Sequence, residues 1–315
     1  MRLIRCANCE VKAYMMKTVF YVCLFLMIGG AIAPYKSAIA QDNSHVQQTK
    51  KFGVPPFYNT KKSAKALSDV DDFSQDIFMV EDRPIQLSVS GHKSSPVIVF
   101  IHGSPGSWNA WADYLFDPEL REKALLIAPD RPAYGGSNDG TSGLSLEEQS
   151  RLIMGAIKQR VPQQKKFILV GHSYGGPLAL RMAIDYPDAV QSMLLLAPAI
   201  SPELVRRKWY NWVADLLLVR AILPSAVHHS NEEMIPLKGE LIKMEDGLET
   251  ITAPTTVIQG EKDNLVHVGN ADFAIDALIN ADVEAIVLPQ RGHFIPWHEY
   301  GLVKQKILKY LGQSK

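Results

Sequence analysis

The chain has 315 residues, which is enough for a single enzyme-sized α/β domain with a large hydrophobic core. Its 33 Lys and Arg residues balance 33 Asp and Glu residues, and no basic stripe interleaved with aromatic residues occurs, so nucleic-acid binding is not expected. A hydrophobic content of 47% with 21% charged residues is ordinary for a globular protein.

The first 40 residues have the pattern of a secretory signal. Between Lys17 and Lys36 lies an uncharged stretch, and Ala38-Ile39-Ala40, a small-x-small cleavage site, follows it. This pattern predicts cleavage after Ala40 and export, to the periplasm or the medium of a bacterium. The alternative is an uncleaved membrane anchor at residues 18–35, which has the minimum length for spanning a bilayer. Three methionines are candidate start residues: Met1, Met15 and Met16.

The cysteines do not indicate a metal or cofactor site. All three cysteines (Cys6, Cys9 and Cys23) precede residue 41, so cleavage would leave a chain without disulfides. Cys6 and Cys9 make half a zinc site that nothing downstream completes, and we expect no metal and no cofactor.

Residues 41–75 are polar, which favours an extended segment that leads into a first strand at Ile77–Val80. The alternative is a basic docking arm.

A buried strand is predicted at Val97–Ile101, followed by the loop His102-Gly103-Ser104-Pro105-Gly106. In acyl transfer, backbone N–H groups stabilise the oxyanion of the tetrahedral intermediate. Ser104 has a free N–H whereas Pro105 has none, so Ser104 is the candidate donor on this loop. We interpret His102, which abuts a glycine turn, as a structural residue that hydrogen-bonds the loop.

The most informative motif is Gly171-His172-Ser173-Tyr174-Gly175. The apolar run Phe167–Val170 before it predicts a short buried strand, and residues 176–183 after it predict a helix with proline in its first turn. A serine between strand and helix, with glycine two residues to either side, is a nucleophile elbow. The sharp turn lifts the Ser173 hydroxyl clear of the sheet, and the Tyr174 N–H becomes the second candidate oxyanion donor.

The strand pattern lapses between Ala199 and Thr252, and we predict a helical cap inserted at about residues 199–252. Apolar residues recur there at helical spacing. Two interpretations stay open: the apolar stripe packs on the core domain, or it forms the wall of an apolar acyl or aryl pocket. The candidate pocket residues are Trp108, Trp209, Trp212 and Leu216.

Serine becomes a nucleophile when a base takes its proton, and that base needs an orienting carboxylate. In the elbow scaffold both partners follow the serine in the chain. His293 is the candidate base, because it lies in a loop between an apolar run and a helix-like C-terminal segment. Asp263 is the candidate acid, because it closely follows the β-branched run Thr255–Gly260; Glu261 is the alternative.

Five motifs resemble those of the α/β-hydrolase family and occur in the order typical of that family. The resemblance extends from about Ile77 to Tyr310. The motifs are His102 to Pro105, Asp130 to Ser137, Gly171 to Gly176, Gly260 to Asp263, and Gly292-His293. The resemblance implies an α/β fold: a mostly parallel, mainly eight-stranded sheet with helices on both faces and a small helical cap. It also implies a Ser–Asp–His triad without a cofactor, and an Asp130 that hydrogen-bonds the backbone. Epoxide hydrolases and haloalkane dehalogenases of this family carry an aspartate where this chain has Ser173, which excludes them.

The predicted organisation is a signal peptide at 1–40, a polar extension at 41–75, and an α/β-hydrolase domain at 76–315. The predicted function is a serine hydrolase that cleaves a carboxylic ester, or a lactone or thioester, through an acyl-enzyme intermediate. Its partner is a small acyl substrate, and membrane contact is expected only with an uncleaved leader.

Three alternatives stay open on the same fold: an aminopeptidase or amidase, a carbon–carbon bond hydrolase, and a non-catalytic binding protein. An aminopeptidase needs carboxylates near the pocket to hold the substrate's ammonium group. The acidic residues Glu232-Glu233 and the stretch Glu240 to Glu249 could serve, but we expect them to face solvent.

Overall fold

The computed structural model describes residues 72–91, 96–163, 166–205 and 225–313. The predicted leader, most of the polar extension, and the pocket candidates Trp209, Trp212 and Leu216 lie outside these residues. In the part of the chain that is described, no helix is both long and apolar enough to cross a membrane.

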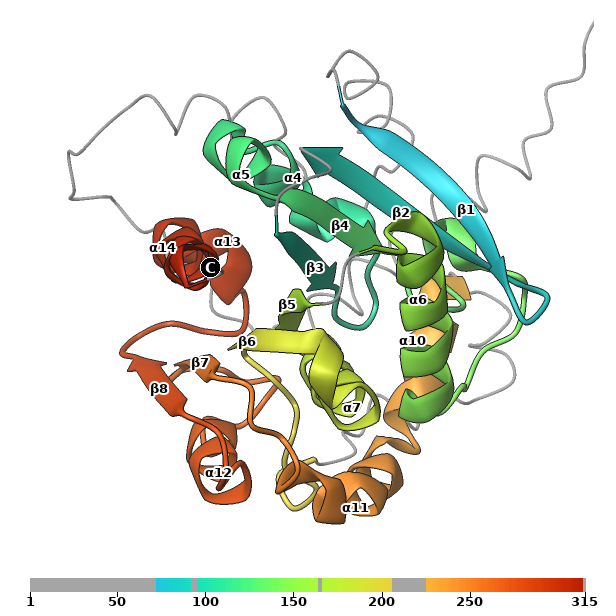
Figure 1. Ribbon diagram of the computed structural model, residues 1–315. Helices are drawn as coiled ribbons and strands as arrows, with labels where there is room; N and C mark the ends of the chain where they lie inside the picture. Colours follow the sequence, from blue (N-terminus) through green and yellow to red (C-terminus); the bar gives the residue numbers. More distant parts are fainter. Residues whose placement is uncertain (1–71, 92–95, 164–165, 206–224, 314–315) are drawn as a thin grey trace, which may run out of the picture.

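Eight strands form one sheet with the spatial order β1-β2-β4-β3-β5-β6-β7-β8 (Figure 1). The strands are β1 (Ser74–Val80), β2 (Arg83–Gly91), β3 (Val97–Ile101), β4 (Leu125–Pro129), β5 (Phe167–His172), β6 (Val190–Leu196), β7 (Thr255–Gly260) and β8 (Val283–Leu288). The pairs β1–β2 and β2–β4 are antiparallel, and all the others are parallel. The predicted fold class is therefore confirmed.

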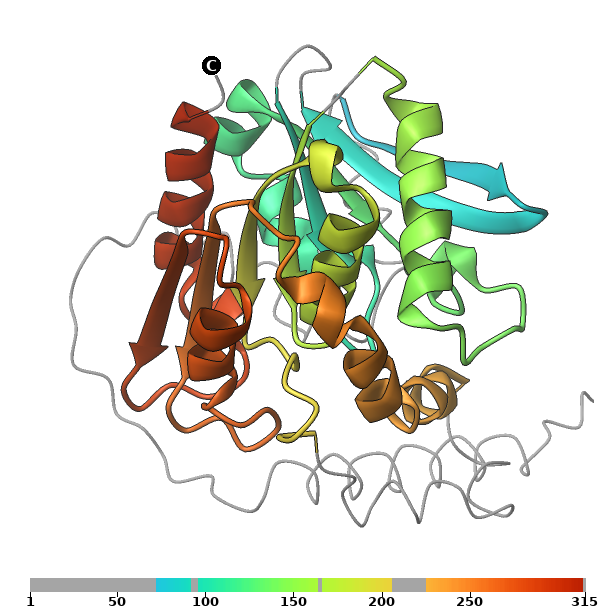
Figure 2. The ribbon, with the colours of Figure 1, turned by 60° about the horizontal axis from the view of Figure 1, so that its bottom comes forward.

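Helices cover both faces of this sheet, as Figure 2 shows. They are η1 (Trp108–Trp111), α4 (Ala112–Leu115), α5 (Pro118–Lys123), η2 (Gly135–Ser137), α6 (Leu146–Arg160), α7 (Gly175–Asp185), η3 (Pro187–Ala189), α10 (Ser225–Met234), α11 (Leu237–Leu248), α12 (Asn270–Ala277), α13 (Ile295–His298) and α14 (Tyr300–Gly312). Strands β3, β4, β5 and β7 are buried along their whole length, which is typical of parallel strands covered on both faces.

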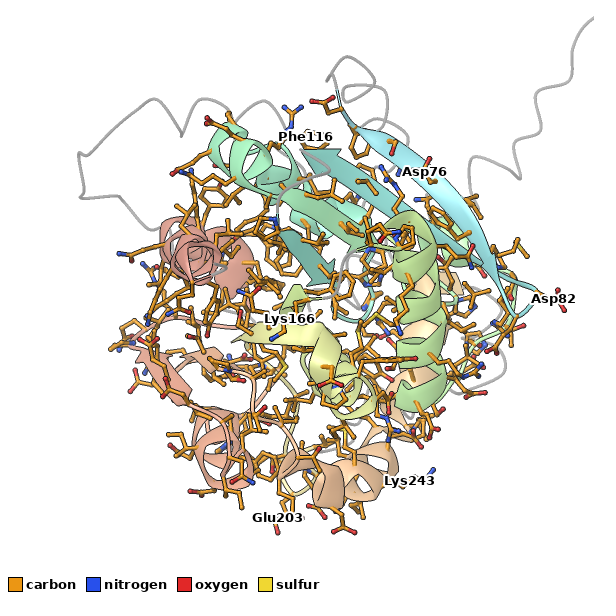
Figure 3. The ribbon with its side chains drawn as sticks, in the orientation of Figure 1. Asp76, Asp82, Phe116, Lys166, Glu203 and Lys243 are labelled. Carbon is orange, nitrogen blue, oxygen red and sulfur yellow. The ribbon has the colours of Figure 1, made fainter. Side chains whose placement is uncertain are left out.

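Because side chains alternate between the two faces of a strand, the sheet divides the hydrophobic core into two clusters. In β3, Val97, Val99 and Ile101 face a cluster built with α6, α7, α11 and α12. Ile98 and Phe100 face the other cluster, which is built with η1, α4, α5 and α14. Side chains fill the space on both faces of the sheet (Figure 3).

Two helices of the predicted cap, α10 and α11, connect β6 to β7, and α11 packs on α7. Its buried face consists of Leu237, Leu241, Met244 and Leu248, at helical spacing. Both helices lie at the end of the sheet toward which the parallel strands run (Figure 2). Helices α10 and α11 therefore lie beside the edge where the loops after β3, β5, β7 and β8 meet.

Candidate active site

Ser173 occupies a strained turn between β5 and α7. Its φ of 55° lies in the left-handed region that residues with a side chain seldom adopt, and such strain clusters at functional sites. A Cβ at Gly171 would lie 2.4 Å from the Gly175 carbonyl oxygen, and one at Gly175 would lie 2.2 Å from the Ile101 oxygen. Only glycine fits at these two positions, so the turn has the shape of the predicted elbow.

Backbone hydrogen bonds connect this turn to the end of β6. The Ser173 N–H donates to the Leu196 carbonyl at 3.0 Å, and the Ala199 N–H donates to the Ser173 carbonyl at 3.3 Å. Ser173 itself remains partly exposed while its neighbours His172 and Tyr174 are buried. The turn thus holds the serine rigidly at the surface of the sheet edge.

The loop after β3 lies against this serine. A Cβ at Gly103 would lie 3.0 Å from the Ser173 Cβ, so the next peptide group, which carries the Ser104 N–H, is close to the nucleophile candidate. Among the described residues, neither the Ser104 N–H nor the Tyr174 N–H donates to another protein group. Both candidate oxyanion donors are therefore available to a ligand.

His102 has the structural role expected of it. Its Nδ1–H donates to the Gly103 carbonyl at 2.8 Å, and its Nε2 accepts the Arg131 N–H at 3.0 Å. Burial, followed by the charge of Arg131, holds the pKa of His102 well below its usual value. A buried imidazole whose pKa is lowered and whose two nitrogens are both hydrogen-bonded stabilises the loop.

Asp263, behind β7, and His293, behind β8, lie in direct contact. The His293 Nδ1–H donates to Asp263 Oδ2 at 2.7 Å, and the two side chains are 8% and 0% exposed. Asp263 Oδ1 accepts the N–H groups of Leu265 and Val266, each at 2.8 Å. Burial alone would raise the pKa of Asp263, but the hydrogen bond from His293 and these backbone N–H groups hold it below its usual value.

The alternative acid, Glu261, lies apart from this pair: its Oε2 accepts the Gln290 N–H at 3.3 Å, and the residue is exposed. With Nδ1 of His293 held by Asp263, its Nε2 is the nitrogen left for proton transfer. The contacts of the described residues include no direct hydrogen bond between Ser173 and His293. Such bonds often tighten only when substrate binds.

Two residues that the sequence analysis did not single out support the acid–base pair. Gln259, fully buried at the end of β7, donates its Nε2–H to Asp263 Oδ2 at 3.0 Å. His172 donates its Nε2–H to the His293 carbonyl at 3.1 Å, and burial together with His293 lowers the pKa of His172 to about 3. A polar residue at the end of an apolar strand was the available signal for Gln259.

The structure corrects the expectation that Glu233 faces solvent. Glu233 is 4% exposed, and its carboxylate pairs with the Arg131 guanidinium through two contacts of 2.7 and 2.8 Å. Arg131 is fully buried, and a buried guanidinium requires a carboxylate partner. Glu245, Asp246 and Glu249 on the same cap are exposed, as expected.

Trp108 belongs to the core and does not form the wall of an open pocket. Its side chain is 2% exposed and packs on Phe73 with ring centroids 5.4 Å apart. The Trp108 N–H donates to Asp130 Oδ1 at 2.7 Å, and the Gly136 N–H donates to Asp130 Oδ2 at 2.8 Å. Asp130 therefore hydrogen-bonds the backbone as expected, while its burial raises its pKa to about 6.

Comparison with known proteins supports the fold assignment. The family model of the alpha/beta hydrolase fold matches residues 96–234, which include the elbow and the loop after β3. The chain has the α/β-hydrolase fold. Within the described residues, this hydrolase-fold chain has no group of three or more His, Cys, Asp or Glu side chains that could hold a metal ion.

Its relatives are distant and chemically diverse. The dihydrolipoyllysine-residue acetyltransferase component of an acetoin cleaving system from Pseudomonas putida is 24% identical over 251 residues, which cover 70% of this chain and 65% of that protein. A fluoroacetate dehalogenase from Burkholderia sp is 30% identical over 129 residues, 40% of this chain and 41% of that protein. The matches thus span less than two thirds of the length of these relatives.

Solved structures share the fold at low identity. A serine hydrolase from the polyaromatic hydrocarbon-degrading bacterium Cycloclasticus zankles has a TM-score of 0.62 at 17% identity, covering 77% of this chain and 99% of that one. A likeness at this identity shows the fold alone.

Proposed function

We propose that the protein is a serine hydrolase that cleaves a carboxylic ester through an acyl-enzyme intermediate on Ser173. The observation that carries the proposal is the buried contact of 2.7 Å between His293 Nδ1 and Asp263 Oδ2. Asp263 follows β7 and His293 follows β8, at the same edge of the sheet where Ser173 follows β5 with a φ of 55°. A nucleophile, a base and an orienting acid at one edge are the parts that acyl transfer requires.

In the proposed first step, Ser173 Oγ attacks the ester carbonyl while His293 Nε2 takes the hydroxyl proton. Asp263 keeps the proton of His293 on Nδ1 and stabilises the imidazolium that forms. The carbonyl oxygen becomes an oxyanion, which accepts hydrogen bonds from the N–H groups of Ser104 and Tyr174. When the intermediate collapses, the alcohol leaves with the proton from His293, and the acyl group remains on Ser173.

In the second step, His293 Nε2 takes a proton from water, and the resulting hydroxide equivalent attacks the acyl carbonyl. Collapse of this second intermediate returns the proton to Ser173 Oγ and releases the carboxylic acid. The same two N–H groups stabilise the second oxyanion. No cofactor enters either step.

The surroundings of the cap glutamates favour an ester over an aminopeptidase substrate. To bind the ammonium group of a substrate, a carboxylate must not already be paired with another cation. Glu233 pairs with Arg131, and it also accepts a hydrogen bond from the Tyr134 hydroxyl at 2.7 Å. Glu232 lies 3.0 Å from His228 Nε2, and Glu240 lies 2.8 Å from Lys243 Nζ. These three carboxylates are already engaged within the protein.

A fluorophosphonate probe tests the nucleophile. We expect it to label Ser173 of the purified protein and no other serine, and we expect turnover of p-nitrophenyl esters of graded chain length. Ser173→Ala should lose both labelling and turnover, while its free energy of unfolding changes by less than about 1 kcal/mol, as for ordinary substitutions outside the core. Labelling of the alanine variant would show that another residue is the nucleophile, and faster cleavage of aminoacyl anilides than of esters would favour the peptidase.

A further inference from the structure

Arg131 and Glu233 form an ion pair buried between the core domain and the cap. Arg131 follows β4, whereas Glu233 lies on α10, 102 residues further along the chain. Arg131 Nη1 contacts Glu233 Oε2 at 2.7 Å, Nη2 contacts Oε1 at 2.8 Å, and the side chains are 0% and 5% exposed. This two-point contact fixes the orientation of both planar groups.

The remaining donors of this guanidinium contact the loop after β3. Nε donates to the His102 carbonyl and Nη2 to the Gly103 carbonyl, both at 3.1 Å, while Nη1 also donates to Gln149 Oε1 at 2.9 Å. All five N–H groups of Arg131 therefore have an acceptor. The Glu233 carboxylate accepts two of these five hydrogen bonds, and it is the charged group among the acceptors.

The Gly103 carbonyl belongs to the same peptide group as the Ser104 N–H. Because a peptide group is planar, a hydrogen bond that fixes its oxygen also fixes the direction of its N–H. Arg131 therefore orients the first candidate oxyanion donor from the opposite end of the peptide. The Tyr174 ring, whose residue carries the second donor, lies 4.4 Å from Arg131 Cζ.

We propose that Glu233 is a positioning residue that, through Arg131, orients the Ser104 and Tyr174 N–H groups, so that docking of α10 on the core completes the oxyanion hole. The role in turnover rests on the proposed ester hydrolysis. Glutamine at position 233 would leave the buried guanidinium without a counter-charge and would set an NH2 group against one of its N–H groups, so Arg131 would have to shift or admit water. Either change would leave the Gly103 carbonyl with the hydrogen bond from His102 Nδ1 alone, so the orientation of the Gly103–Ser104 peptide would be less well fixed.

The test compares Glu233→Gln with Glu240→Gln. Glu240 is a matched control because it also joins the cap to the core, where its Oε2 accepts the Leu146 N–H at 3.2 Å, but it does not contact the loop. We expect Glu233→Gln to lower kcat by about 10- to 100-fold, part of the loss known for removing an oxyanion donor, with KM changed less than about twofold. Glu240→Gln should leave both constants near their starting values.

An alkyl boronic acid provides a second readout, since its tetrahedral serine adduct places an oxygen in the oxyanion hole. Its affinity should fall by the same factor as kcat in Glu233→Gln, with concentrations corrected by fluorophosphonate titration of folded sites. A rise in KM with unchanged kcat and boronate affinity would make Glu233 a pocket residue and overturn the proposal.

A double variant separates positioning from folding. Arg131→Met with Glu233→Met removes both charges together, which buried pairs often tolerate without loss of stability. The proposal expects this variant to fold and still show the lower kcat. A double variant with wild-type kcat would mean that the pair only holds the fold together.

Amide hydrogen exchange tests the coupling without any substrate. Glu233→Gln should speed exchange of the Arg131 amide, which donates to His102 Nε2 in the loop after β3, relative to Glu240→Gln in the otherwise unchanged protein. If fluorophosphonate labelling fails but this exchange changes, ester hydrolysis is wrong and the coupling stands. If labelling succeeds while exchange and kcat are both unchanged, the coupling is wrong and the hydrolase stands.

Discussion

Asp263 shows how a carboxylate can be buried and yet remain charged. Its Oδ2 accepts hydrogen bonds from His293 and Gln259, and its Oδ1 accepts the N–H groups of Leu265 and Val266. Burial favours the neutral acid, but four donors favour the carboxylate, and the pKa of Asp263 lies below its usual value. The acid thus stays ionised through the pH range in which a histidine base works.

Asp263→Asn should leave the fold intact and lower kcat by about 10⁴-fold, the scale known for this change in another serine hydrolase. The asparagine amide placed at Oδ2 would donate to His293, so the ring would carry its proton on the nitrogen that faces Ser173. Steady-state ester hydrolysis, with circular dichroism for the fold, measures the effect.

Glu261→Gln is the matched control, because Glu261 is exposed and contacts the Gln290 backbone. It should change kcat by less than about twofold, as for a surface substitution. If the glutamine variant were inactive and the asparagine variant active, the acid would lie two residues upstream of Asp263.

The sequence predicted those site residues that belong to short contiguous motifs. Ser173, Asp263 and His293 each follow a strand within a few residues, so a local pattern gives their positions. Glu233 and Arg131 have no such pattern, because their contact spans 102 residues and depends on how the cap docks. Charge alone predicted an exposed Glu233, since an unpaired glutamate is seldom buried.

At the scale of elements, continuous apolar runs identified β3 and β5, whereas β2 was not predicted. Polar residues alternate along β2, where Ser88 and Ser90 are fully buried despite their hydroxyl groups. Ser90 donates to the Leu115 carbonyl, which satisfies its hydroxyl inside the protein. A strand whose polar residues find partners only in the folded structure has a weak sequence signal.

The short helix α13 connects the His293 loop to the core. The buried Tyr114 hydroxyl donates to the Pro296 carbonyl at 2.5 Å, and Trp297 Nε1 donates to the Ala110 carbonyl at 3.1 Å. Since α13 begins two residues after His293, these bonds limit the movement of the candidate base. The position of His293 thus depends on η1 and α4 as well as on its own strand.

Tyr114→Phe should lower the free energy of unfolding by about 1–3 kcal/mol, the cost of leaving a buried carbonyl unpaired. The ring volume is kept, so no cavity adds to this loss. Urea denaturation measures the change, and hydrogen exchange over residues 294–298 should rise. Tyr186→Phe, at a partly exposed position directly after α7, is the control and should change stability by less than about 0.5 kcal/mol. Equal stability of the two variants would contradict a role for the Tyr114 hydroxyl.

For the molecule as a whole, three buried groups with shifted pKa values act in opposite directions on acid stability. Burial lowers the pKa of His102 and of His172, the latter to about 3, so neither takes up a proton in the folded state near pH 5. In the unfolded chain both take up protons below about pH 6.5, so stability falls as the pH falls through this window. Burial raises the pKa of Asp130 to about 6, which stabilises the folded state as the pH falls from about 6 to 4.

At pH 5, His102 and His172 bind protons only in the unfolded state, whereas Asp130 binds one mainly in the folded state. The unfolded state therefore binds about one more proton than the folded state. The free energy of unfolding should therefore fall by about 1.4 kcal/mol per pH unit between pH 6 and pH 5, as urea denaturation at stepped pH would measure. Asp130→Asn removes the opposing group, so its decline should steepen to about 2–3 kcal/mol per pH unit whatever its stability at pH 7. His172→Gln removes one of the two histidines and should flatten the decline toward zero. Stability that rises on acidification from pH 6 to pH 5 in the unsubstituted protein would mean that His102 and His172 accept protons where they lie, and that the sheet edge beneath Ser173 is open to water.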